Sequence, residues 1–165
     1  MLKYTKKVIQ HFLKPKNVGE IKDADGVGKA GNPVCGDVMH VYIKVGKKKV
    51  KGREEEIIKN ARFQTLGCPA AIAASDVLCE LVKGKTLKEA EKIEKKDIVK
   101  KLGGLPPIKI HCSVLGARTL KKAIEDYRNK RKKKNSVIPL NLIIKKEGYK
   151  MSCGSCKPRK KKKRR

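Results

Sequence analysis

Three of the six cysteines in this 165-residue chain occupy positions that suit metal chemistry. They are Cys35 before Gly-Asp37, Cys68 between Gly and Pro, and Cys112 after His111. Each is predicted where a strand or helix begins, and the N-terminal end of a helix lowers the pKa of a thiol. Thiolates bind zinc and iron–sulfur clusters, and one carboxylate or imidazole in place of a thiolate makes such a site easier to leave. The residues alone therefore predict a soft-metal site and leave its metal open.

The ordinary alternative for any one cysteine is burial as a small apolar side chain. Cys79 fits this alternative, because it falls in line with Ile72 and Val82 on a predicted helix, and we assign it no function. For the three boundary cysteines, the adjacent Asp37 and His111 favour the metal site and are added to it as candidate ligands.

Other metal-binding side chains are placed outside this site. His11 lies on a short predicted helix and His40 on the polar face of a strand, so both are predicted to be surface or structural residues. Cys153-Gly-Ser-Cys156 is only half of a typical zinc or cluster site. This pair is left open as a disulfide, a metal site between subunits or a pair without function.

An antiparallel sheet is predicted to position the site. Residues 38–45 alternate strictly between apolar and polar side chains, which is typical of a half-buried strand. Residues 57–66 supply one or two further strands, and residues 46–52 indicate a turn or a ragged hairpin before them. The glycine-rich stretch 26–36 is expected to give the loop that carries Cys35 its mobility.

Four helices are predicted from apolar residues at helical spacing. They span residues 4–13, 69–83 and 86–93 and the stretch from Ser113 to Tyr127. The first is expected to pack on the sheet, and Pro69 and the Thr86–Glu89 pair indicate two helix starts. The double glycine and double proline of residues 102–112 predict an extended segment that leads to His111 and Cys112.

Positive charge is concentrated at the C-terminus. Residues 1–127 carry 27 basic and 15 acidic side chains, whereas residues 128–165 carry 17 and 1. We predict one folded domain over residues 1–134 and a basic, flexible extension with the CxxC over residues 135–165. Such an extension attracts nucleic acid only non-specifically.

Length and composition give further expectations. The chain suits one domain, and it has no run of roughly 20 apolar residues, the length that a bilayer span requires. Its start, Met1-Leu2-Lys3-Tyr4, lacks the apolar stretch of a signal peptide. We therefore expect a cytoplasmic protein with no membrane contact and with reduced cysteines.

Three segments, in this order, closely resemble the IscU/NifU-type iron–sulfur scaffold family. They are Gly31-Asn-Pro-Val-Cys-Gly-Asp37, Thr65-Leu-Gly-Cys68-Pro-Ala-Ala-Ile-Ala-Ala-Ser75 and Leu105-Pro-Pro-Ile-Lys-Ile-His-Cys112-Ser-Val-Leu. The stretch His11-Phe-Leu-Lys-Pro-Lys-Asn-Val-Gly19 resembles the first helix of that family and its exit. No insertion precedes Gly67-Cys68, which makes the chain more similar to the IscU branch than to the Suf-type branch.

The resemblance implies an α+β fold of the IscU/SufE-like kind, a small three-stranded antiparallel sheet flanked by helices. It implies a [2Fe–2S] cluster on Cys35, Cys68 and Cys112, with Asp37 or His111 as an exchangeable fourth ligand or release switch. The chain would then be a scaffold that builds the cluster and hands it to apo-proteins, without turnover of its own. By position, Cys112 is the candidate acceptor of persulfide sulfur.

The resemblance also implies partners. A cysteine desulfurase delivers the sulfur, a ferredoxin-type donor supplies electrons, and apo iron–sulfur proteins accept the cluster. A DnaK-type chaperone with its co-chaperone is expected to grip the segment Leu105, Pro106, Pro107, Ile108 and Lys109. Its two prolines pre-extend an apolar-then-basic peptide, which suits binding in a groove. A homo-oligomer is compatible with the sequence.

Two other functions stay open. The same fold could be a zinc-bound sulfur acceptor that activates a cysteine desulfurase, with zinc in the protein as isolated. The net charge of +28 also suggests a basic nucleic-acid-binding protein, although the folded part lacks a recognised nucleic-acid motif.

Overall fold

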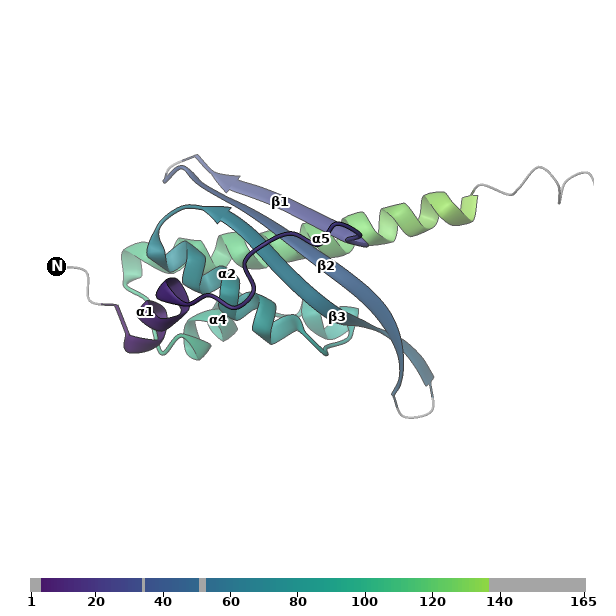
Figure 1. Ribbon diagram of the computed structural model, residues 1–165, viewed down its shortest axis with the longest axis horizontal. Helices are drawn as coiled ribbons and strands as arrows, with labels where there is room; N and C mark the ends of the chain where they lie inside the picture. Colours follow the sequence, from purple (N-terminus) through teal and green to yellow (C-terminus); the bar gives the residue numbers. More distant parts are fainter. Residues whose placement is uncertain (1–3, 34, 51–52, 137–165) are drawn as a thin grey trace, which may run out of the picture.

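A three-stranded antiparallel sheet with helices packed against it forms the body of the protein (Figure 1). The computed structural model describes residues 4–33, 35–50 and 53–136. In chain order the elements are α1 (Lys6–Leu13), β1 (Gly26–Asn32), β2 (Asp37–Val50), β3 (Arg53–Leu66), α2 (Pro69–Val82), α3 (Leu87–Glu91), α4 (Lys95–Lys101), the 3₁₀ turn η1 (Pro107–Lys109) and α5 (Ile110–Ser136). The strands follow the order β1-β2-β3, which confirms the predicted α+β fold.

Strand β2 is the centre of the sheet and shows the predicted alternation. Met39, Val41 and Ile43 are fully buried, while His40 and Tyr42 on the opposite face are partly exposed. Helices α2 and α5 lie behind the sheet in Figure 1 and pack on it. Burial of each large apolar side chain in this layer stabilises the fold by roughly 2 kcal/mol.

Strand β1 corrects the prediction of a mobile glycine-rich loop, because residues 26–32 pair with β2. The glycines of β1 let the strand approach the backbone of α5. A Cβ at Gly28 would collide with the carbonyl oxygen of Thr119 and would lie 2.7 Å from the amide nitrogen of Ala123. These glycines are therefore needed for close packing, and only the short turn between β1 and β2 carries Cys35.

The outer edge of β1 is bonded to α5. The N–H of Val27 donates to Asp126 Oδ2 at 2.9 Å, and Lys122 Nζ donates to the carbonyl oxygen of Lys29 at 3.2 Å. An edge strand with free backbone groups invites pairing with another chain. Here side chains of α5 occupy two of those groups.

The β2–β3 hairpin is more regular than predicted. The stretch 46–52, expected to be a turn or a ragged hairpin, is strand as far as Val50 and strand again from Arg53. Opposite charges face each other along this arm. The pairs are Lys47 with Glu56, Lys48 with Glu55 and Lys49 with Glu54. Lysine and glutamate are individually poor strand formers, and the cross-strand pairing compensates. Glu56 also accepts hydrogen bonds from Tyr127 and Arg131, which ties the arm to α5.

Helix α1 packs mainly on α2, not on the sheet as predicted. The contact is organised by Asp76, a fully buried carboxylate of α2. Its Oδ1 accepts hydrogen bonds from the backbone N–H groups of Lys16 at 3.0 Å and Asn17 at 2.9 Å, and its Oδ2 lies 2.7 Å from His11 Nδ1. A buried carboxylate requires such partners to offset its lost hydration. His11 is thus the structural residue that the sequence predicted.

Helices α2 and α3 begin as predicted. Pro69 is the first residue of α2, and Thr86 and Glu89 form a reciprocal capping box at α3. Helix α4 was not predicted from the sequence, because this short, lysine-rich helix buries only Ile98. A short helix with one buried residue gives almost no periodic signal.

Helix α5 begins at Ile110, three residues before the predicted start. The residues Pro107–Lys109 form a 3₁₀ turn where the sequence predicted an extended segment. Proline is tolerated in a first helical turn, because the N–H that it lacks has no partner there. His111 and Cys112 consequently lie in the first turn of α5 rather than before it.

At its other end, α5 reaches Ser136. The Cys153–Cys156 pair and most of the basic extension lie outside the described residues. Within the ranges that the structure describes, no helix is both long and apolar enough to cross a membrane.

Candidate metal centre

Three segments that are far apart in sequence meet at one end of the sheet. Cys35 and Asp37 lie at the entrance of β2, Cys68 is the residue before α2, and His111 and Cys112 lie in the first turn of α5. Two groups of candidate ligand atoms form there, Cys35–Asp37–His111 and Asp37–Cys68–Cys112, and the atoms of each group lie within 4.8 Å of one another. The structure thus brings together all five predicted ligand residues, with Asp37 shared by both groups.

The inner group is two thiols against one carboxylate. The Sγ atoms of Cys68 and Cys112 are 3.7 Å apart, and Asp37 Oδ2 lies 3.9 Å from the first and 3.6 Å from the second. Asp37 Oδ1 accepts a hydrogen bond from the backbone N–H of Cys68 at 3.3 Å. This hydrogen bond places the carboxylate at the N-terminus of α2, where the helix dipole favours negative charge. Only 3% of Asp37 is exposed, so the carboxylate is shielded from water there.

Burial raises the pKa of the Cys112 thiol well above its usual range, with further contributions from Cys68 and then Asp37. Cys112 is fully buried, so its thiolate would lose hydration and face a carboxylate. The expectation that a helix N-terminus favours the thiolate is therefore wrong for Cys112, because desolvation outweighs the helix. A bound metal cation would reverse this balance by supplying positive charge at the sulfur.

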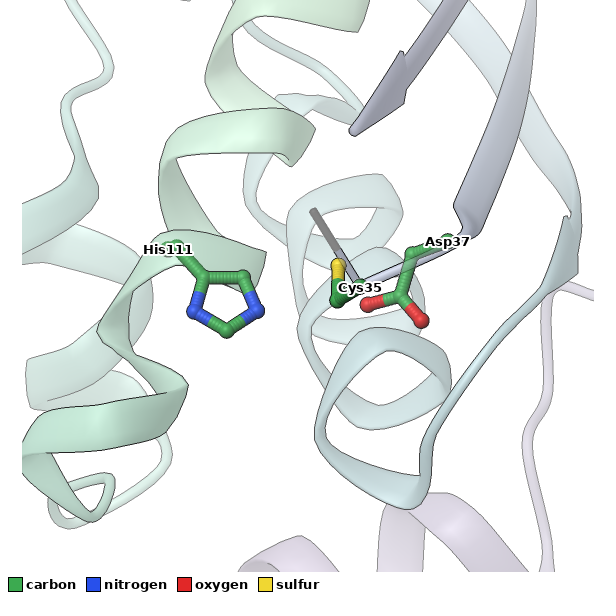
Figure 2. A group of neighbouring side chains, drawn as sticks. All are labelled: Cys35, Asp37 and His111. Atoms are coloured by element: carbon green, nitrogen blue, oxygen red, sulfur yellow. The ribbon is translucent and has the colours of Figure 1, made fainter. Parts of the chain in front are cut away.

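The outer group faces solvent. Cys35 is exposed in the turn before β2, next to Gly36, whose φ of 71° suits glycine. Figure 2 shows the His111 ring on α5 facing Cys35 across the site, with the Asp37 carboxylate beside Cys35. The Nε2 atom of His111 is buried and has no hydrogen-bond partner among the described residues. A buried nitrogen without a partner is costly, and a bound metal would supply one.

The donor set suits a soft metal that must leave again. Three thiols supply the strong ligands of zinc or of an iron–sulfur cluster. Asp37 and His111 are both within reach of the fourth ligand position. With the three thiols they make five candidate donors. A site with one more donor than a four-coordinate metal needs can exchange ligands without exposing the metal fully to water.

Two neighbours of the site were not singled out from the sequence. Tyr4 packs against the cluster of Ala70, Ala71 and Cys112, and burial raises the pKa of its phenol, with Cys68 as the next cause. Gly67 lies against the Asp37 carboxylate. Both contacts join residues that are far apart in sequence. The sequence therefore indicated only that Tyr4 lies on a helix face and that Gly67 precedes a helix, and not that either residue adjoins the site.

Cys79 is confirmed as a core residue. It is fully buried in the main apolar cluster and lies in neither candidate metal group, and burial raises the pKa of its thiol strongly. A thiol in this environment is inert.

The segment from Leu105 to Lys109 lies directly before the first turn of α5. Leu105 is half-buried and packs against both apolar clusters, whereas Ile108 is 66% exposed. The segment therefore presents an apolar side chain to solvent within a short distance along the chain from His111 and Cys112.

Comparison with known proteins gives consistent matches. A family model described as the NifU-like N terminal domain matches residues 3–134. The iron–sulfur cluster assembly scaffold protein IscU 1 of Archaeoglobus fulgidus is 49% identical over 139 residues, 84% of this chain and 86% of the relative. The protein named IscU of Aquifex aeolicus is 52% identical over 124 residues, 75% of each chain, and that of Escherichia coli K12 is 48% identical over 134 residues, 79% and 98%.

The fold is also found among solved structures. A crystal structure from Fervidobacterium islandicum AW-1, of a protein described as an iron–sulfur cluster assembly scaffold for the SUF system, matches with a TM-score of 0.57. It covers 73% of this chain and 96% of its own at 21% sequence identity, which supports the fold alone.

Proposed function

Because the chain belongs to the NifU-like N-terminal domain family and is a scaffold for iron–sulfur cluster assembly, we propose that it builds a [2Fe–2S] cluster on Cys35, Cys68 and Cys112. The observation that supports this proposal is the convergence of three separate cysteine segments around the Asp37 carboxylate. The cluster is cargo, which the protein assembles and then passes to apo iron–sulfur proteins. The protein is thus a carrier without turnover of its own.

The sulfur is proposed to arrive as the persulfide of a cysteine desulfurase. Once the site has opened and hydration allows the thiol of Cys112 to lose its proton to water, the resulting thiolate attacks the outer sulfur, a new S–S bond forms on Cys112, and the desulfurase thiolate leaves. The transferred sulfur is formally neutral, so it needs two electrons from a ferredoxin-type donor to become sulfide. Because Cys112 is fully buried, the site must open before a persulfide can reach its Sγ.

Asp37 and His111 are proposed to exchange as the fourth ligand. Asp37 Oδ2 already contacts both inner thiols, and His111 Nε2 is buried without a partner in the described part of the chain. A hard carboxylate ligand binds a soft metal less firmly than a thiolate ligand does. Coordination through Asp37 would therefore leave the cluster easier to transfer than coordination by a fourth thiolate.

A DnaK-type chaperone with its co-chaperone is proposed to promote release. The exposed side chain of Ile108 provides an apolar anchor, and Leu105 connects the same segment to the core. Withdrawal of this segment would disturb the first turn of α5, which carries two of the five candidate ligands. Mechanical coupling of this kind would link chaperone binding to cluster loss.

The remaining partners and the location are proposals of the same kind. We place the protein in the cytoplasm, and a homo-oligomer is compatible with the proposal. We attribute any nucleic-acid binding to non-specific attraction by its basic C-terminal residues.

The scaffold proposal is tested by anaerobic reconstitution with iron, cysteine and a cysteine desulfurase. We expect the visible absorption of a [2Fe–2S] cluster to appear only when the desulfurase is present, and the cluster to move to an apo-ferredoxin. A protein that retains zinc tightly and forms no transferable cluster would contradict the proposal and support the zinc-bound sulfur acceptor.

Asp37→Ala is expected to make the cluster longer-lived and slower to transfer. The substitution removes the hard, exchangeable ligand of the described site, which leaves the fourth position to His111 and stops the ligand exchange that favours release. We expect a change of roughly tenfold in cluster lifetime and transfer rate. The decay of the visible absorption and the rate of transfer to apo-ferredoxin are measured side by side. Glu125→Ala, on the exposed surface of α5, is the control. Unchanged lifetime and transfer in Asp37→Ala would exclude a gating role for this carboxylate.

A further inference from the structure

The backbone conformation at residue 67 does not require the glycine that is found there. The described glycines with positive φ are Gly19, Gly36, Gly84, Gly103 and Gly104. Gly67 is not among them, so an L-amino acid could adopt its conformation without backbone strain. The residue is also exposed, which excludes burial as the reason for its size.

The reason is the Asp37 carboxylate. A Cβ at Gly67 would lie 2.7 Å from Asp37 Oδ1 and 2.9 Å from its Cγ, closer than Cβ atoms approach other heavy atoms in proteins, and 3.2 Å from the Cβ of Ala71. Asp37 is itself buried and bonded through Oδ1 to the N–H of Cys68. Gly67 and Ala71 therefore form a slot at the start of α2 that is only wide enough when residue 67 has no side chain.

We propose that Gly67 is a positioning residue, which keeps the Asp37 carboxylate docked at the N-terminus of α2 and in reach of both inner thiols. This inference rests on the proposed role of Asp37 in cluster release. A methyl group at position 67 closes the slot, so the carboxylate rotates out, loses the N–H of Cys68 and leaves Cys68 and Cys112. Gly67→Ala then resembles Asp37→Ala in direction, although Asp37 is still present.

The apoprotein provides a test that needs no cluster. Hydrogen–deuterium exchange of the Cys68 amide is expected to rise by roughly tenfold in Gly67→Ala and in Asp37→Ala, because each removes a charge-assisted hydrogen bond. Gly31→Ala is the matched control, since a Cβ there would meet its nearest atoms at the ordinary distances of 3.6 and 3.8 Å. An unchanged exchange rate in Gly67→Ala would overturn the positioning role.

The loaded protein tests the consequence. We expect Gly67→Ala to prolong cluster lifetime and slow transfer several-fold, and the double variant Gly67→Ala/Asp37→Ala to behave as Asp37→Ala does. Neighbouring residues that act through one contact show this non-additivity. An effect of Gly67→Ala that persists in full without Asp37 would overturn the inference, because it would act by another route.

The two proposals fail separately. If Asp37→Ala changes neither lifetime nor transfer while Gly67→Ala still raises the exchange of the Cys68 amide, the gating role of Asp37 is wrong and the positioning by Gly67 stands. If Asp37→Ala alters transfer while Gly67→Ala leaves both amide exchange and transfer unchanged, the gating role stands and Gly67 has no part in it.

Discussion

Alanine at Cys35, Cys68 or Cys112 is expected to abolish the formation of a stable, transferable cluster. Each substitution removes one of the three thiols that converge on Asp37, so that only two thiolates remain and both Asp37 and His111 would have to serve as ligands at once, which makes the cluster easier to lose. The measurement is visible absorption after anaerobic reconstitution, followed by transfer to apo-ferredoxin. Thermal unfolding of each apoprotein shows whether its fold is intact.

Cys79→Ala is the matched control for this series. Its thiol is fully buried in the main core, away from both ligand groups, so the substitution is expected to lower the unfolding free energy by about 1 kcal/mol and leave assembly unchanged. If one of the three site variants loaded and transferred a cluster as the unmodified protein does, that cysteine would have to be removed from the proposed site.

The largest effect on stability is expected from Gly28→Ala. The added methyl group would collide with the carbonyl oxygen of Thr119 and crowd the amide nitrogen of Ala123, and neither backbone atom can rotate away as a side chain would. Overpacking of this kind costs about 3 kcal/mol, enough to loosen β1 from α5. Chemical denaturation of the apoprotein measures the loss.

The control for this prediction lies on the same strand. Gly31→Ala places its Cβ at 3.6 Å from the nearest atom, so its unfolding free energy is expected to change by less than about 0.5 kcal/mol. Equal stability of Gly28→Ala and Gly31→Ala would show that β1 can move away from α5 at little cost.

Local patterns were sufficient for much of the fold. The alternation along β2 follows from a sheet with one buried face. Pro69 marks a helix start because the N–H that proline lacks would have no partner in the first turn, and the capping box at Thr86 closes within three residues. The ligands Cys35, Cys68 and Cys112 could also be proposed, because Gly36, Gly67, Pro69 and His111 adjoin them in sequence.

Where local preference and tertiary contact disagreed, the sequence-based prediction was wrong. Strand β1 reads as a glycine-rich loop, because glycine is a poor strand former, yet Gly28 is required by the backbone of α5. The regular hairpin beyond Gly46 was predicted to be a turn or a ragged hairpin, because its Lys and Glu residues show their pairing only when the two strands are side by side. Cys112 was expected to be a thiolate, because the start of its helix can be recognised in the local sequence. Its burial depends on segments that are distant in sequence, and no local pattern shows it.

By itself, the sequence determined which residues could bind the cluster and which elements carry them, since residue type and spacing are properties of the chain. Only the tertiary structure decided that the Asp37 carboxylate lies against both Cys68 and Cys112, that His111 Nε2 is left without a partner in the described part of the chain, and that Gly67 leaves the carboxylate its slot. The reason is that burial, desolvation and close packing arise between segments 30 to 75 residues apart, where no local pattern records them.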